Sequence, residues 1–226
     1  MTGLRISVVV VLWALLILYT GQSLAEENPV AHSHFGYNLT TVSLGVDIFF
    51  KENGRLPFSA DELTDSGLLP AGLTNPLTGQ ALNFAMFPVE PGGIGIVCSR
   101  GESMELVVCD VNGREKILPI DTSKYVSTDI SSQGLRMVLY MHWAENALVN
   151  YQSAFGSVPS NLTELMNSVF WPFEGQKNPF TGEPLTFAGE TDGSIIFRFN
   201  PDHVSVHVNY SGDKFGMVRV PFGDPN

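Results

Sequence analysis

Two stretches of the chain place apolar residues at alternating three- and four-residue steps. The members of the two series are Phe35, Leu39, Val42, Val46 and Phe49, and Met137, Met141, Ala144, Leu148 and Tyr151. This spacing predicts two helices, each with one buried face. Gly54 and Gly156 follow the two series and Pro57 and Pro159 come next, so both helices are expected to end at these glycines.

Each predicted helix is followed by a shorter helix and by segments with a two-residue apolar alternation. Ser59 with Glu62, and Asn161 with Glu164, fit a capping box, which makes a structural role more plausible for these carboxylates than acid or base catalysis. Asn75-Pro76 and Asn178-Pro179, each with Thr-Gly two residues later, predict turns that lead into strands. The four strands predicted in each half are QALNFAMF, GIGIVCS, MELVVCDV and REKILPI, then EPLTFAG, GSIIFRFN, DHVSVHVNY and GMVRVPF.

The two halves of the chain match each other in sequence. At an offset of 102 residues, and of 103 from Asn75 onward, 13 of 28 aligned positions are identical, whereas average residue usage predicts about two. The sequence therefore predicts an α+β protein of two tandem copies, at residues 33–125 and 130–226. Each copy is expected to be a longer N-terminal helix and a short helix packed on a small antiparallel β-meander.

The charge balance bears on the class of partner. The chain of 226 residues has 12 Lys and Arg against 23 Asp and Glu, a net charge of -11. Because a protein this acidic cannot make many phosphate contacts, we expect no nucleic-acid partner.

The N-terminus predicts export. Arg5 precedes an unbroken apolar run from Ile6 to Tyr19, and Ser23-Leu24-Ala25 places small residues where a signal peptidase reads. Residues 1–25 therefore fit a secretory signal peptide, with a location in the periplasm or at the cell surface. The alternative is an uncleaved membrane anchor over residues 6–24, which would be the only membrane contact.

Export makes a disulfide between Cys98 and Cys109 reasonable, because oxidising compartments let disulfides persist. The two lie in successive predicted strands and would face each other if the hairpin paired them. Two buried free thiols are the alternative.

The order of these elements resembles a known family. A helix, then Gly-x-[Leu/Val]-Pro-x-[Ser/Asn]-x-x-Glu-Leu, then Asn-Pro-x-Thr-Gly and a small meander is similar to the globular domain of type II secretion pseudopilins and type IV pilins. The run from Ile6 to Tyr19 has no Glu, unlike the start of mature family members, so we expect two pilin-type heads behind an ordinary export signal. The resemblance also implies a possible calcium site. Asp192, Asp202 and Asp213 are the candidate ligands, although solvated turn acids explain them better.

No motif for hydrolysis, nucleotide binding or zinc binding was found. His32 and His34 are expected in a flexible lead-in with a surface role, and no cofactor or metal is expected. The main expectation is a non-catalytic structural or interaction protein that binds other envelope or secretion proteins. The alternative is a ligand-binding or sensory module with a site between the two repeats. The candidate interaction surface, which would line a groove in the alternative, is Trp143, Phe170, Trp171 and Phe173.

Overall fold

A computed structural model describes residues 29–70, 73–85, 87, 89–99, 103–120, 131–189, 191–200, 203–210 and 213–221. The predicted signal peptide, residues 1–25, lies outside the described residues. The fold is mixed α+β, with helices and two small antiparallel sheets. The elements are α2 (Pro29–Asn53), α3 (Ala60–Asp65), β1 (Ile94–Ser99), β2 (Ser103–Cys109), β3 (Glu115–Pro119), α4 (Ser132–Phe155), α5 (Leu162–Met166), β4 (Ile195–Phe199), β5 (His203–Tyr210) and β6 (Asp213–Pro221).

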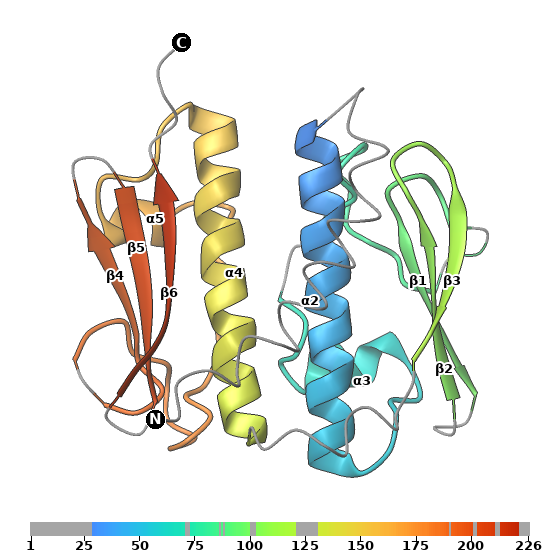
Figure 1. Ribbon diagram of the computed structural model, residues 1–226, viewed down its shortest axis with the longest axis horizontal. Coiled ribbons are helices and arrows are strands. Elements are labelled where there is room, and N and C mark those ends of the chain that lie inside the picture. The colour runs from blue at the N-terminus through green and yellow to red at the C-terminus, as the bar shows by residue number, and fades with distance from the viewer. Residues whose placement is uncertain are drawn as a thin grey trace, which may run out of the picture.

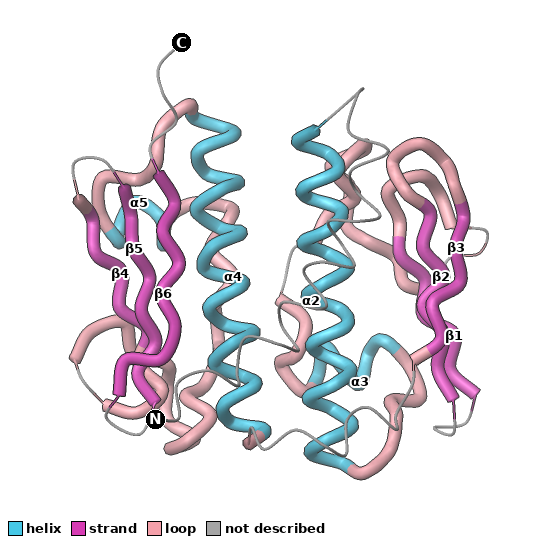
Figure 2. The backbone as a smooth tube through the Cα atoms, viewed as in Figure 1, coloured by secondary structure: helices cyan, strands magenta, loops and turns pink. Residues whose placement is uncertain are grey.

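The elements form four layers, with the two long helices in the middle and one sheet on each outer side (Figure 1). Strand order is β1-β2-β3 in one sheet and β4-β5-β6 in the other, as antiparallel meanders. The tube view shows the same order of layers, with both helices between the strands (Figure 2). α2 and α4 run side by side in opposite directions.

This arrangement explains why each long helix is buried on more than one side. The predicted residues Val42 and Val46 of α2 are fully buried, but so are Ile48 and Thr41, which lie off the predicted stripe. On α4, Trp143 is buried as well as the predicted Ala144. A helix between a sheet and a second helix needs two apolar faces, so the one-face expectation was correct but incomplete.

The helix ends agree with the sequence expectation at their C-termini. Gly54 and Gly156 have φ of 67° and 72°, and their amides donate to the carbonyls of Phe50 and Gln152 at 2.8 Å. In contrast, α2 begins at Pro29. His32 and His34 therefore lie in a helix, and the expectation of a flexible lead-in was wrong.

The predicted capping boxes form in a modified way. Asn161 accepts a hydrogen bond from the Glu164 amide at 3.0 Å, as expected, but Ser59 makes no side-chain capping bond. The carboxylate of Glu164 accepts from the Ser160 amide at 2.8 Å, and that of Glu62 from the Phe58 amide at 2.7 Å. Both glutamates thus reach one residue further back than a capping box requires, which supports their structural role.

Two predicted strands are loops. The turns at Asn75 and Asn178 form, but the segments after them make only the isolated bridges Thr74 to Ala81 and Lys177 to Pro184 among the described residues. Each sheet therefore has three strands, at the positions predicted for the other three.

The disulfide expectation was also wrong, because Cys98 and Cys109 are free. In the β1–β2 hairpin Cys98 lies opposite Met104, while Cys109 lies five residues further along β2. At about 3.3 Å per residue this is a displacement of about 17 Å. The two cysteines also face opposite sides of the sheet, because an odd number of residues separates the pairing positions.

Gly45 of α2 allows the loop after α3 to approach the helix closely. A Cβ atom at this position would lie 2.9 Å from the carbonyl oxygen of Leu68. Replacing Gly45 with alanine is therefore expected to lower the free energy of unfolding by about 1 to 3 kcal/mol, although alanine is the better helix former by about 1 kcal/mol. Urea unfolding of both proteins measures the change, and a stabilised variant would contradict this account of the contact.

Candidate functional site

The first sheet has one face in the core and one face in solvent. Its core side chains are between 1% and 8% exposed: Ile94, Ile96, Met104, Leu106 and Val108. Because side chains alternate along a strand, the residues between them point outward. Of the outward cross-strand rows, Ser99–Ser103 and Cys109–Glu115 lie at the two ends of the sheet, and the two middle rows are Gly95–Val107–Ile117 and Val97–Glu105–Pro119.

These two rows are mostly apolar. Ile117 is 58% exposed, Val97 is 36% exposed, and Phe87 from the preceding loop is 49% exposed. A Cβ atom on Gly95 would lie 2.9 Å from the Phe87 ring, so this ring rests on the glycine. We call the surface of Phe87, Val97, Val107, Ile117 and Pro119 the outer apolar face.

The second sheet does not repeat this surface. Its outward positions pair Ile196 with His207 and Arg198 with Ser205, and Arg198 is exposed. The fold is therefore compatible with polar residues on the outside of such a sheet. An exposed apolar surface that the fold does not require is typical of a binding site.

The outer apolar face offers side chains for face-on packing, and Pro119 weakens the edge of β3 as a site for strand addition. The carbonyls of Met104 and Arg114 accept bonds from Ile120 and Asp110, which sets the alternation of the β2–β3 ladder. By this alternation Glu115, Ile117 and Pro119 turn their backbone groups to the free edge, and Pro119 has no N–H. A partner would therefore contact the side chains of the face, each contributing on the order of 1 kcal/mol when its exposed half is buried.

The predicted interaction residues lie elsewhere. Trp143 and Phe173 are 2% and 4% exposed, so neither can belong to an exposed surface. Trp171 packs on Phe173 and Phe197 at ring distances of 5.1 and 6.2 Å, which places this cluster between α4 and the second sheet. Phe170 and Trp171 are half-buried. Trp143, Trp171 and Phe173 thus belong mainly to the core between α4 and the second sheet, while Phe170 lies at its border.

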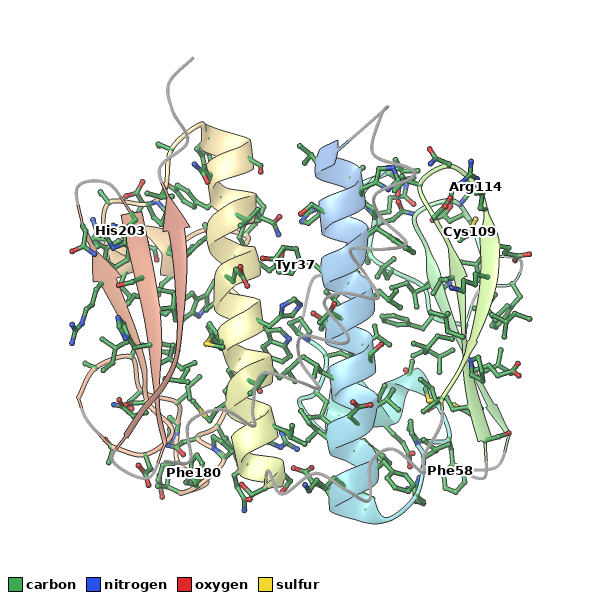
Figure 3. The ribbon with its side chains drawn as sticks, in the orientation of Figure 1. Tyr37, Phe58, Cys109, Arg114, Phe180 and His203 are labelled. Carbon is green, nitrogen blue, oxygen red and sulfur yellow. The ribbon has the colours of Figure 1, made fainter. Side chains whose placement is uncertain are left out.

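Several polar side chains meet between the two long helices, and we call these contacts the helix seam. Arg136 of α4 donates two hydrogen bonds of 2.7 Å to the Glu52 carboxylate of α2. The Tyr37 ring stacks on His142 at 4.7 Å, and the Nε2 of His142 donates to the Tyr37 carbonyl at 3.2 Å. Tyr37 also forms a side-chain hydrogen bond with Glu145. Figure 3 shows Tyr37 pointing from α2 toward α4.

Burial shifts the titration of the helix seam. It lowers the pKa of His142 to about 4, although the hydrogen bond to the Tyr37 carbonyl opposes this. Burial also raises the pKa of Glu145 and of Tyr37. His142 is therefore a neutral imidazole, and Glu145 and Tyr37 lose their protons less readily than in water. The contacts among these three side chains link the two helices.

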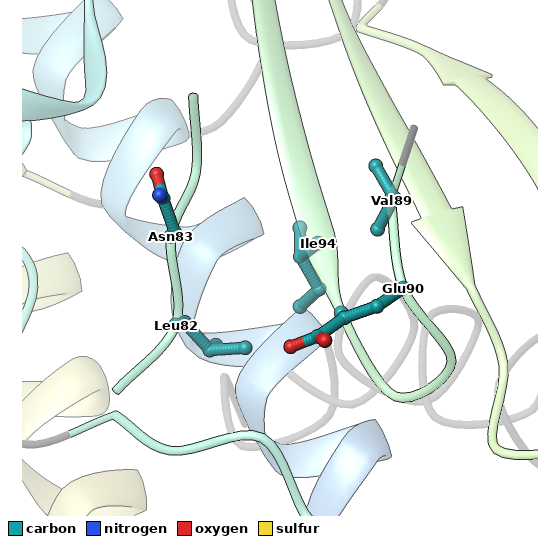
Figure 4. A pocket seen from close by; sticks show the side chains of 6 residues that line it. Leu82, Asn83, Val89, Glu90 and Ile94 are labelled. Carbon is teal, nitrogen blue, oxygen red and sulfur yellow. The ribbon is translucent and has the colours of Figure 1, made fainter. Parts of the chain in front are cut away.

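The remaining candidates for small-molecule or metal binding are modest. A hollow lined by Leu82, Asn83, Val89, Glu90, Gly93 and Ile94 admits about one water molecule (Figure 4). The Glu90 carboxylate beside it accepts from Asn75 Nδ2 at 3.1 Å. Among the described residues, no cluster of three His, Cys, Asp or Glu is placed to hold a metal ion. Of the predicted calcium ligands, Asp202 and the side chain of Asp213 lie outside the described part.

The sequence reading missed the outer apolar face. The signal for it was the apolar residues at outward positions, Val97 in β1, Val107 in β2 and Ile117 in β3, since a half-buried strand normally has polar residues there. Within the part of the chain that the structure describes, no helix has the length and apolar character needed to cross a bilayer. No family model, no curated protein and no solved structure matches this chain.

Proposed function

We propose that this chain is an exported, non-catalytic structural or interaction protein that works in a cell-envelope or secretion-related assembly. In this proposal it consists of two pilin-like units in tandem, and it binds a protein partner through the outer apolar face. The observation that carries the proposal is the exposure of Phe87, Val97 and Ile117 on one sheet, where the position of Val97 is occupied in the other sheet by Arg198.

The local geometry of the two Asn-Pro turns supports the tandem duplication. Oδ1 of Asn75 accepts from the Leu77 amide at 2.8 Å, and Oδ1 of Asn178 accepts from the Phe180 amide at 2.9 Å. The amide group of each asparagine then donates to a backbone carbonyl in the loop before the sheet, at 2.9 Å to Pro91 and 2.7 Å to Asp192. Such an agreement in a buried, irregular loop is expected from copies of one ancestral unit.

The engagement of the carboxylates in structural bonds supports a non-catalytic role. Glu62 receives two hydrogen bonds from Arg55 and one from the backbone, and these bonds lower its pKa to about 2. Glu164 bonds Tyr151 and Ser160, which lowers its pKa as well. Both glutamates occupy the same place in the two halves, at the start of a short helix.

The test is a comparison of three immobilised full-length proteins in an envelope extract. Wild type is expected to enrich secretion or surface proteins, and Val97→Thr/Ile117→Thr is expected to lose at least 80% of this enrichment, since both changes keep the β-branched shape but add a hydroxyl. The control is Leu77→Thr, which replaces an apolar residue that is 43% exposed and lies outside both sheets. Enrichment that survives the double substitution, or no enrichment of such proteins by wild type, would contradict the proposal.

A further inference from the structure

A second exposed apolar surface lies where α4 ends. Val169 is 92% exposed, Phe155 is 61% exposed and Met166 is 43% exposed. The Phe155 ring contacts the Phe170 ring at 6.3 Å, which joins the helix end to the loop after α5. We call Phe155, Met166, Val169 and Phe170 the end patch.

The end patch lies at the end of the molecule where α2 begins. The side chains of His34 and Asn150 are hydrogen-bonded, which pairs the second turn of α2 with the last turns of α4. Because the helices are antiparallel, Pro29 and Phe155 are at the same end (Figure 1). Val30, in the first turn of α2, is itself 60% exposed.

The fold does not require this patch. At the repeat offset of 102 residues, the positions of Phe155, Met166 and Val169 are occupied in the first half by Asn53, Thr64 and Gly67. These three positions near the end of α2 therefore carry no large apolar side chain, although Phe58 is exposed at that end. The first half folds without large apolar side chains at these positions. The exposed apolar side chains of the end patch therefore indicate a contact with another apolar surface.

The apolar run that precedes α2 in the sequence indicates a lipid bilayer as this surface. Pro29 is joined by nine residues, 20–28, to the apolar run from Ile6 to Tyr19. Nine residues span at most about 30 Å. If the apolar run is held in a bilayer, the end patch is therefore kept within about 30 Å of the lipid surface.

We propose that, in a chain that keeps the apolar run from Ile6 to Tyr19 as a membrane anchor, the end patch rests on the surface of that lipid bilayer. The contact is apolar, because a protein with a net charge of -11 is not attracted to anionic headgroups. It should therefore form on zwitterionic lipid and persist in high salt. The inference does not depend on the protein partner proposed above, which binds on a different surface.

The test measures the water accessibility of one introduced thiol at each end of the full-length chain. The variants are Val169→Cys in the end patch and Phe58→Cys as the control, since Phe58 is 54% exposed and lies at the opposite end (Figure 3). Each is treated with a membrane-impermeant maleimide before and after addition of phosphatidylcholine vesicles. Labelling is quantified site by site by mass spectrometry, so that Cys98 and Cys109 are read separately.

We expect vesicles to slow the labelling of the Val169→Cys protein at least tenfold, also in 0.5 M salt, and to leave the Phe58→Cys protein unchanged. Equal labelling with and without vesicles would overturn the inference. Slow labelling already before vesicles are added would also overturn it, because another segment of the chain or a second copy would then cover the patch.

Discussion

Replacement of Gly193 with alanine is expected to destabilise the protein by about 3 kcal/mol or more. Gly193 has φ of +82°, and a Cβ atom there would lie 2.2 Å from Oδ1 of Asn178. The left-handed backbone alone costs a non-glycine residue about 1 to 2 kcal/mol. The overlap adds to this, because Asn178 is 4% exposed and cannot move without losing its bonds to Phe180 and Asp192.

The matched control is Gly182→Ala in the same loop region. Gly182 has φ of +74°, but nothing lies within 4 Å of the position of its Cβ. This variant should therefore show the backbone cost alone, about 1 to 2 kcal/mol in urea unfolding. Equal losses for the two substitutions would refute the proposed packing of Asn178 against Gly193.

Acidification from pH 7.5 to pH 4.5 is expected to lower the free energy of unfolding through His142 by roughly 2 to 3 kcal/mol. The pKa of His142 is lowered from 6.5 to about 4 in the folded protein. The unfolded chain therefore takes up a proton near pH 6.5 while the folded protein does not, so stability is present above this pH and is lost as the pH falls toward 4. Urea unfolding at a series of pH values measures the loss.

Other groups in the helix seam also respond to acid, so a variant must isolate the histidine. Burial lowers the pKa of His34, which acts in the same direction, and raises the pKa of Glu145, which acts in the opposite direction. His142→Gln keeps a donor for the Tyr37 carbonyl and has no titrating group. Its stability should fall less than that of wild type over this range, and an equal fall in both proteins would show that His142 is not the cause.

The helices could be predicted from the sequence because their signals are local. The three- and four-residue steps from Val42 to Phe49, and the glycine that ends each long helix, depend only on neighbours along the chain. The segment QALNFAMF was wrongly predicted as a strand, because an alternating sequence pattern does not show whether a neighbouring strand is there to pair with it. Phe84 offers only its carbonyl to the Ile96 amide, at 2.9 Å, so this segment lies beside β1 without forming a ladder.

The register of β1 and β2 could not be predicted. In its C-terminal half β2 is apolar on both faces, with Leu106 and Val108 inward and Val107 and Cys109 outward. A shift of the pairing by an odd number of residues therefore exchanges two apolar faces, and the pattern does not select between them. This ambiguity led both to the wrong cysteine pairing and to the missed outer apolar face.

The placement of one sheet on each outer side of the helix pair gives the protein two broad faces, which differ in their residues. The sheet on one side exposes apolar residues such as Ile117, and the sheet on the other side carries Arg198 and His207 at outward positions. A molecule that packs on the first sheet leaves the outer surface of the second sheet exposed to solvent. Molecules in contact with one sheet and with the other would therefore not compete for the same surface.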